Sequence, residues 1–348
     1  MIWAFAFNIL INSLLSFFTS ALVVLLFIGI FRIKDYRLRA FLYCLPVFKL
    51  FVDPFLYDFQ HWALIQHINP FYAEAGSRAF SAMIYYPSTL TKYIPIGAGI
   101  QLSINNTQTF SIADLLYLSM GSKTTKAIIG LVFAVSATGV AVWGYRLAKS
   151  LRYMAVLRQS STPCLRAVFN QSLVRRLLRS HASIRVSHVV DVPCAVGLIK
   201  KEIYFPSHLV EALSQEEFEA IIAHETAHLR WKDGIVQAFS KLIYTVFWWV
   251  PMGKLIQAIE YNHECACDDH VEKYGISRLD LASAIVKTAK GTTAPAIPVT
   301  CFVKSSSLKR LQHLVRPRKK AHYAIHWVQA SLESIVIMAV LFGKLWIF

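Results

Sequence analysis

The chain opens with a long run of apolar residues. No charged side chain occurs before Arg32, and the stretch 9–31 alone exceeds the roughly 20 residues that a helix needs to cross a bilayer. Basic residues cluster immediately afterwards, at 32–39, whereas a cleaved signal peptide carries its positive charges ahead of the apolar run. The pattern therefore predicts a membrane anchor.

Three further segments are candidate spans. The segment 127–145 is largely apolar and carries no charge, and the segment 332–348 is shorter and carries Lys344 near its end. The segment 41–57 contains Lys49 and Asp53, so we expect it to span only if these charges pair four residues apart or face other helices. Together the four segments predict a multi-pass α-helical membrane protein.

The distribution of charge orients these segments. The formal net charge is +16, and nearly all of the excess lies in 32–39 and between 146 and 320. Because loops on the cytoplasmic side are enriched in Lys and Arg, we expect both regions in the cytoplasm and the loop 58–125 outside. A location in the bacterial cytoplasmic membrane explains the positive charge, so no nucleic-acid partner is expected.

The sequence accordingly divides into five predicted parts. The first two membrane segments with their short basic loop occupy 1–57, an extracytoplasmic loop occupies 58–125, and a third membrane segment occupies 126–147. A cytoplasmic domain follows over 148–325, and a fourth membrane segment closes the chain over 326–348. The extracytoplasmic loop has no steady period, which indicates either a small exported lobe or a loop lying against the membrane.

The cytoplasmic part begins with strands and continues with helices. Short β-branched and aromatic runs at 184–190, 195–199 and 202–205 predict strands. Ser214 and Glu217 then form a capping box, which predicts a helix that runs to about Trp231 and ends at Gly234. The apolar stretch 235–259 indicates a buried helix or one at the membrane interface, and a further helix is expected over 254–274.

The capped helix carries a pattern that is typical of zinc hydrolases. His224 and His228 are four residues apart, so both imidazoles point the same way and can hold one zinc ion. Glu225 lies beside them, where it can take a proton from zinc-bound water and deliver it to the leaving amine. The alternative is a pair of surface histidines on an amphipathic helix.

A catalytic zinc ion needs a third protein ligand and an open position. Glu260, Glu264 and Asp268 are four residues apart, and a nearby cation would relieve the repulsion along this helix face. We take Glu264 as the ligand and Asp268 as the acceptor that orients a ligand histidine, although spacing alone does not separate Glu264 from Glu260. The alternative is a solvated acidic face.

Other polar residues near these positions have less defined roles. Asp233 is expected either to hold a histidine or helix end, or to be solvated. His263 and His270 are expected to lie outside the metal's ligand set or to be exposed.

Three motifs resemble the BlaR/MecR-type family of membrane-embedded zinc metallopeptidases, which are gluzincins of the antirepressor type. They are His224-Glu-Thr-Ala-His-Leu-Arg-Trp-Lys-Asp233, the aromatic stretch Trp248-Trp249-Val-Pro251, and Glu264-Cys-Ala-Cys-Asp268-Asp269. In that family the Glu of the E-x-A-C-D motif is the third zinc ligand, which implies Glu264 here. The resemblance also implies a cytoplasmic α+β zincin-like metallopeptidase domain whose edge strand can take an extended substrate.

The chain departs from the family pattern at several points. His263 stands where an Arg commonly precedes the ligand Glu, and Lys201 replaces a usual Pro. No extracellular sensor domain follows the last predicted span, so we expect the protease module without β-lactam reception.

The resulting hypothesis is a membrane-bound zinc endopeptidase with its active site facing the cytoplasm. It would hydrolyse peptide bonds of a cytoplasmic or membrane-proximal protein, in signalling or regulation, by Glu-assisted attack of zinc-bound water. Its partners would be a protein or peptide substrate and the lipid bilayer, and no oligomeric state is indicated. One alternative is a membrane protease of the CAAX-processing or HtpX type, although the Asn-Ala pair expected before that active helix is missing. The other is a non-catalytic membrane sensor or scaffold.

Overall fold

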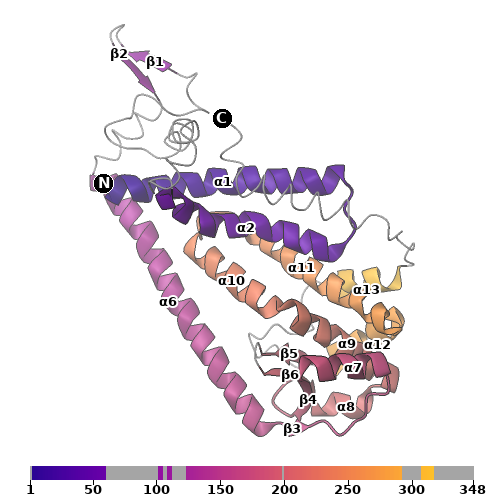
Figure 1. Cartoon of the computed structure of the whole chain (residues 1–348). Coiled ribbons are helices and arrows are strands. Elements are labelled where there is room, and N and C mark those ends of the chain that lie inside the picture. The colour runs from indigo at the N-terminus through magenta and orange to yellow at the C-terminus, as the bar shows by residue number, and fades with distance from the viewer. Residues whose placement is uncertain are drawn as a thin grey trace.

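The computed structural model describes residues 2–59, 101–104, 108–111, 123–197, 200–291 and 307–316 (Figure 1). Three long helices, α1 (Ile2–Ile30), α2 (Tyr36–Phe59) and α6 (Lys123–Ser160), account for the predicted membrane segments that fall in the described part of the chain. Figure 1 shows α1 and α2 side by side, with α6 running away from them toward the small sheet.

The turn between α1 and α2 is defined by two local features. Arg32 adopts a left-handed conformation with φ 46°, which ends α1. The Asp35 carboxylate then accepts hydrogen bonds from the backbone N–H groups of Arg37 at 2.8 Å and Leu38 at 3.1 Å, and so satisfies free donors at the start of α2. The basic cluster predicted from the sequence therefore forms a compact helical hairpin turn.

One helix in the described part of the chain, Lys126–Ser160, is long and apolar enough to cross a membrane, and it contains the predicted span 127–145. The predicted span 9–31 forms most of α1, which has a shorter apolar stretch at Ser16–Ile30. The segment 41–57 is helical within α2, where Lys49 is buried. The fourth predicted span and the side chain of Asp53 lie outside the described residues.

The loop 58–125 contains strands that its sequence did not predict. β1 (Gln101–Ile104) and β2 (Gln108–Ser111) pair as antiparallel strands. Residues 60–100, 105–107 and 112–122 of this loop lie outside the described residues, and so does most of the segment 292–325.

A small mixed sheet forms the first part of the predicted cytoplasmic domain. Its order is β3 (Thr162–Pro163), β4 (Ala182–Ser187), β6 (Lys201–Pro206) and β5 (Cys194–Val196). β4 and β6 are parallel, and the other two pairs are antiparallel. The three strands predicted from 184 onward are therefore confirmed as β4, β5 and β6, although β4 and β5 end three residues earlier than predicted. β5 is an edge strand of the described sheet.

Gly197 makes the reversal between β5 and β6 possible. Its φ is +103°, and a Cβ atom there would lie 1.8 Å from the carbonyl oxygen of Lys200. No side chain fits in that space, so only glycine can occupy this position.

The remainder of the domain is helical, and α7, α8 and α9 contact the sheet. They are α7 (Gln171–Ser180), α8 (Ser207–Ala212), α9 (Gln215–Trp231), α10 (Asp233–Val246), α11 (Gly253–His270), the 3-10 turn η1 (Val271–Tyr274), α12 (Arg278–Gly291) and α13 (Ser307–Val315). The predicted capping box of Ser214 and Glu217 is confirmed at the start of α9. The predicted helix 254–274 is α11 followed by η1.

The predicted extent of this helix to Trp231 is confirmed, but Gly234 was wrong as the residue that ends it. The left-handed residue is Lys232, with φ 56°, and Gly234 lies in the first turn of α10. The Lys232 N–H bonds to the His228 carbonyl, and α10 begins at once at Asp233. The chain therefore turns two residues earlier than the glycine suggests, which directs Asp233 back toward α9.

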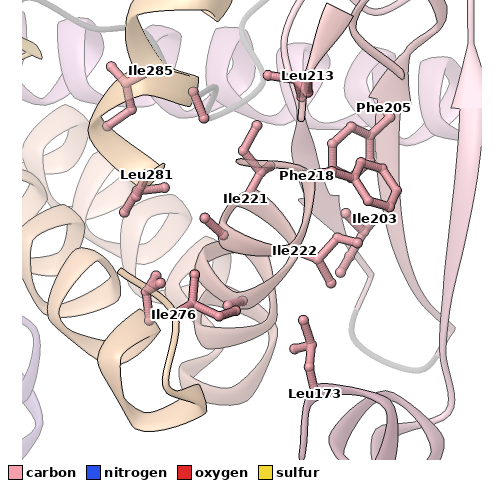
Figure 2. Packing of buried hydrophobic residues seen from close by; sticks show 14 of the residues in the cluster. Leu173, Ile203, Phe205, Leu213, Phe218, Ile221, Ile222, Ile276, Leu281 and Ile285 are labelled. Carbon is pink, nitrogen blue, oxygen red and sulfur yellow. The ribbon is translucent and has the colours of Figure 1, made fainter. Parts of the chain in front are cut away.

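The main apolar core lies between the sheet and α12, with α9 running through its centre (Figure 2). Phe218 of α9 packs on Phe205 of β6 with ring centroids 4.8 Å apart. The fully buried side chains around α9 include Ile203, Phe205, Phe218, Ile221, Ile222, Leu281 and Leu173. Because interiors are close-packed, this core fixes both the rotation and the depth of α9.

A second apolar cluster joins the N-terminal helices to α10 and α11. Phe17 of α1 and Leu50 of α2 pack with Ile243 of α10 and Ile259 of α11. α11 therefore contacts both α2 of the helical hairpin and α9.

The capping box provides a test of the α9 register. Glu217 is buried, and its carboxylate accepts from Ser283 Oγ at 2.6 Å, Lys287 Nζ at 2.7 Å and the backbone N–H of Ser214 at 2.8 Å. Burial raises the pKa of Glu217, but Lys287, Ser283 and Ser214 outweigh it and hold the pKa below its usual 4.5.

We predict that Glu217→Gln lowers the free energy of unfolding by about 1–3 kcal/mol near neutral pH, since a charged acceptor is lost. The extra stability of the wild type comes from a carboxylate whose pKa is lowered in the folded state. This extra stability is therefore present above the unfolded pKa of 4.5 and is lost as the pH falls below that value. Thermal unfolding in detergent at several pH values checks this. Glu211→Gln, at an exposed position on α8, is the control. A difference between Glu217→Gln and wild type that persists unchanged well below pH 4.5 would contradict the assignment.

Candidate metal centre

Two crossing helices bring the predicted site residues together. α9 supplies His224, Glu225 and His228, and α11 supplies Glu264 and Asp268. His224 and Asp268 are fully buried, and Glu225 is 3% exposed. The site therefore lies at the α9–α11 contact, next to the core that fixes α9.

Three possible ligand atoms converge there. The Nε2 atoms of His224 and His228 are 3.1 Å apart. Glu264 Oε2 lies 3.6 Å from Nε2 of His224, and its Oε1 lies 3.8 Å from Nε2 of His228. These donors form a cation-sized group, all within 4.8 Å of one another. Glu260, which the spacing left as an alternative, is not part of any group that could hold a metal ion in the described part of the chain.

A carboxylate lies behind each imidazole. Asp268 Oδ1 is 3.0 Å from Nδ1 of His224, and Asp233 Oδ2 is 2.7 Å from Nδ1 of His228. A carboxylate only accepts, so each Nδ1 is assigned the hydrogen. In the neutral rings the lone pairs then lie on the two Nε2 atoms, which face each other.

This arrangement fits a shared cation. Two Nε2 atoms 3.1 Å apart, with a carboxylate beside them, need a positive charge between them, which is either a proton shared in a hydrogen bond or a metal ion that replaces it. Tetrahedral zinc with Zn–N distances near 2.0–2.1 Å places its two imidazole nitrogens about 3.3–3.4 Å apart, close to the separation seen here. The donor set therefore fits zinc.

The pKa values of the two ligand candidates reflect a site that attracts positive charge. Burial lowers the pKa of His228, but the hydrogen bond to Asp233 and the Glu264 charge raise it to about 9. Burial raises the pKa of Glu264, yet Arg310 and the two histidines hold it well below its usual range. Glu264 is thus an anion at neutral pH and can bind a cation.

Glu225 behaves differently from the other carboxyl groups. Burial raises its pKa, and His228 and His224 offset only part of that increase. A carboxylate that is destabilised in this way has a greater affinity for a proton, which suits a general base.

Two residues of the site were not assigned from the sequence. Arg310 of α13 is 2% exposed and contacts both Glu264 and Asp268, and its only sequence signal is a basic residue in a short helix far along the chain. His263 was expected outside the ligand set or exposed. Its Nδ1 in fact lies 3.0 Å from Asp233 Oδ1, so Asp233 holds two imidazoles.

Cys267 forms a second cation-sized group with His228 and Asp233. Its Sγ lies 3.4 Å from His228 Nδ1 and 3.6 Å from Asp233 Oδ2. Burial and the surrounding carboxylates raise the pKa of this thiol well above its ordinary value, so it stays protonated. This group would also need Nδ1 of His228, which already pairs with Asp233 at 2.7 Å, so the first group is the better cation site.

His270 lies outside the group. Its ring packs edge-on against Trp231 and Tyr274, and burial with nearby cations lowers its pKa to about 4. It is therefore neutral at ordinary pH.

The chain is thus a largely helical protein with a candidate metal centre of the HExxH type. The sequence matches the family described as BlaR1 peptidase M56 over residues 83–314, and the chain belongs to this family. The family is one of membrane-associated metallopeptidases, so membership indicates a protease.

Curated relatives agree with this membership. The methicillin resistance mecR1 proteins of Staphylococcus aureus and Staphylococcus epidermidis are each 25% identical over 172 residues, or 48% of this chain and 29% of the relative. Regulatory protein BlaR1 of Bacillus licheniformis is 25% identical over 211 residues, or 57% of this chain and 34% of the relative. The matches thus span well under half of each relative's length.

The ligand assignment can be tested by metal content. We predict that His224→Ala, His228→Ala and Glu264→Ala each lose zinc, because each removes one donor from the group. Elemental analysis after gentle extraction measures the zinc per chain. Glu260→Ala, one turn earlier on α11, is the matched control and should retain the metal. Zinc loss in Glu260→Ala with full zinc in Glu264→Ala would overturn the assignment.

Proposed function

We propose that this chain is a membrane-bound zinc endopeptidase that uses His224, His228 and Glu264 as metal ligands and Glu225 as its general base. The observation that carries the proposal is the pair of Nε2 atoms facing each other at 3.1 Å beside the Glu264 carboxylate. Asp268 and Asp233 fix the orientation of the two rings from behind. A chance cluster of histidines would not be expected to have a carboxylate behind each ring.

The three ligands define the chemistry. Two nitrogens and one oxygen leave a position open on a four-coordinate ion, as in catalytic zinc sites. When bound, zinc would act as a Lewis acid that polarises a carbonyl and increases the acidity of water.

Glu225 would move the proton. Its raised pKa favours taking a proton from the attacking water, and the same carboxyl group can then give the proton to the leaving amine. Asp268 and Asp233 would hold the Nδ1 protons of the ligand histidines and so keep their Nε2 lone pairs directed into the site.

The substrate would lie along β5. This strand pairs with β6 on one side, and it ends the described four-stranded sheet on the other. α9 contacts β5, so an extended peptide added at that edge would run beside the active helix. Backbone pairing at this edge would favour a substrate peptide in an extended conformation, whatever its sequence.

The biological setting is proposed from the relatives. Their names attach them to methicillin resistance and to regulation, which supports a signalling role for this chain. The positive charge of the region from 146 to 320 favours a site on the cytoplasmic side of a multi-pass topology. The substrate would then be a cytoplasmic or membrane-proximal protein, and the other partner would be the bilayer.

Replacing Glu225 tests the mechanism. Glu225→Gln is expected to reduce peptide hydrolysis by about 10²- to 10⁴-fold, because it removes the general base while it leaves the ligands in place. Proteomes of cells that make wild-type or Glu225→Gln protein would differ in the fragments of the substrate, and zinc content should be equal. Undiminished cleavage by Glu225→Gln would reject the mechanism, and a zinc-free wild type would favour a scaffold.

A further inference from the structure

Arg310 is the one residue of α13 that reaches the metal centre in the described part of the chain. Its Nε and NH2 atoms contact Asp268 at 2.9 and 2.6 Å, and its NH1 lies 2.8 Å from Glu264 Oε2. The side chain is 2% exposed. A guanidinium is removed from water here only because two carboxylates surround it.

We propose that Arg310 is a positioning residue for the metal centre: it holds the ligand Glu264 and the ligand-orienting Asp268 in one fixed arrangement. This inference rests on the proposed zinc site. It gives α13, which begins some forty residues beyond the Glu264–Asp269 motif, a role in metal binding.

The geometry explains why an arginine is needed. A planar guanidinium offers several donors at fixed angles, so one side chain can bridge two carboxylates one turn apart on α11. Arg310 contacts Oε2 of Glu264, and the other oxygen, Oε1, is the one that faces His228. A lysine would carry the same charge without the fork.

α13 itself is firmly attached. His313, one turn after Arg310, lies 2.9 Å from Asp269 Oδ1 and 2.8 Å from NH2 of Arg278. Its other ring nitrogen lies 3.3 Å from the hydroxyl of Tyr36, at the start of α2. These contacts fix α13 against α11, α12 and α2, so Arg310 projects from a rigid support.

A purely electrostatic role makes the opposite prediction. A positive charge beside the site repels zinc, so removing it would tighten zinc binding if charge were all that mattered. A positioning role predicts weaker binding, because Glu264 and Asp268 would no longer be held. The sign of the change in zinc affinity therefore separates the two roles.

The experiment compares zinc affinity, measured by chelator competition on the full-length chain in detergent, among four variants and wild type. Arg310→Lys keeps the charge and loses the fork, and Arg310→Met loses both. Arg185→Lys and Arg185→Met are the controls, because Arg185 is a half-buried arginine of β4 whose hydrogen bonds go to Ser161 and to the carbonyl of Arg158, away from the proposed ligands and from α13.

We expect both Arg310 variants to bind zinc about 10- to 100-fold more weakly than wild type, and both Arg185 variants to bind it as wild type does. The visible spectrum of the cobalt-substituted protein should change with Arg310→Lys and not with Arg185→Lys. Unchanged or tighter zinc binding in both Arg310 variants would overturn the proposal, as would an equal loss in the Arg185 variants. If wild type itself binds no zinc, the proposed function fails instead. If Arg310→Met does not fold, Arg310→Lys alone decides.

Discussion

The metal centre depends on the hydrogen-bonding of two imidazoles to carboxylates on the side away from the metal site. Asp268 and Asp233 occupy the Nδ1 atoms of His224 and His228, which leaves both Nε2 lone pairs directed at the same point. Burial makes both pairings necessary, because an unpaired Nδ1 or carboxylate in this interior would carry a large desolvation cost. The position and tautomer of each ring are thereby fixed before any ion arrives.

The architecture around the site serves this requirement. The apolar core holds α9 between the sheet and α12, so the two histidines cannot rotate with the helix. The early left-handed turn at Lys232 returns Asp233 to His228, and α11 brings Glu264 and Asp268 from the other side. The same α11 packs against the α1–α2 hairpin, so the metal centre and the N-terminal helices share one rigid element. A signal that shifts the hairpin would therefore reach the site through α11.

Much of the site could be predicted from the sequence because the residues that indicate it lie close together along the chain. The spacing of His224 and His228 within a capped helix predicted a shared direction, and the capping box predicted where that helix starts. The choice of Glu264 over Glu260 needed the family resemblance, since both lie on one face of α11, one turn apart, and only the point at which α9 crosses α11 separates them. The residue that ends α9 was wrongly predicted because glycine is the usual left-handed residue, and here a lysine adopts that conformation.

Other features had no sequence signal that could identify them. Arg310 approaches from a helix distant in the chain, and its role depends entirely on tertiary packing. The β1–β2 hairpin lies in a segment without periodicity, and strands of four residues leave too short a pattern to detect. Long-range contacts of this kind are set by the whole fold.

The identity of the metal ligands is the central claim, and X-ray absorption at the zinc edge of the purified protein tests it most directly. The account predicts a shell of nitrogen and oxygen atoms at about 2.0–2.2 Å with the outer scattering of two imidazoles and no sulfur. A sulfur neighbour at about 2.3 Å would move the metal to the group that contains Cys267 and contradict the account.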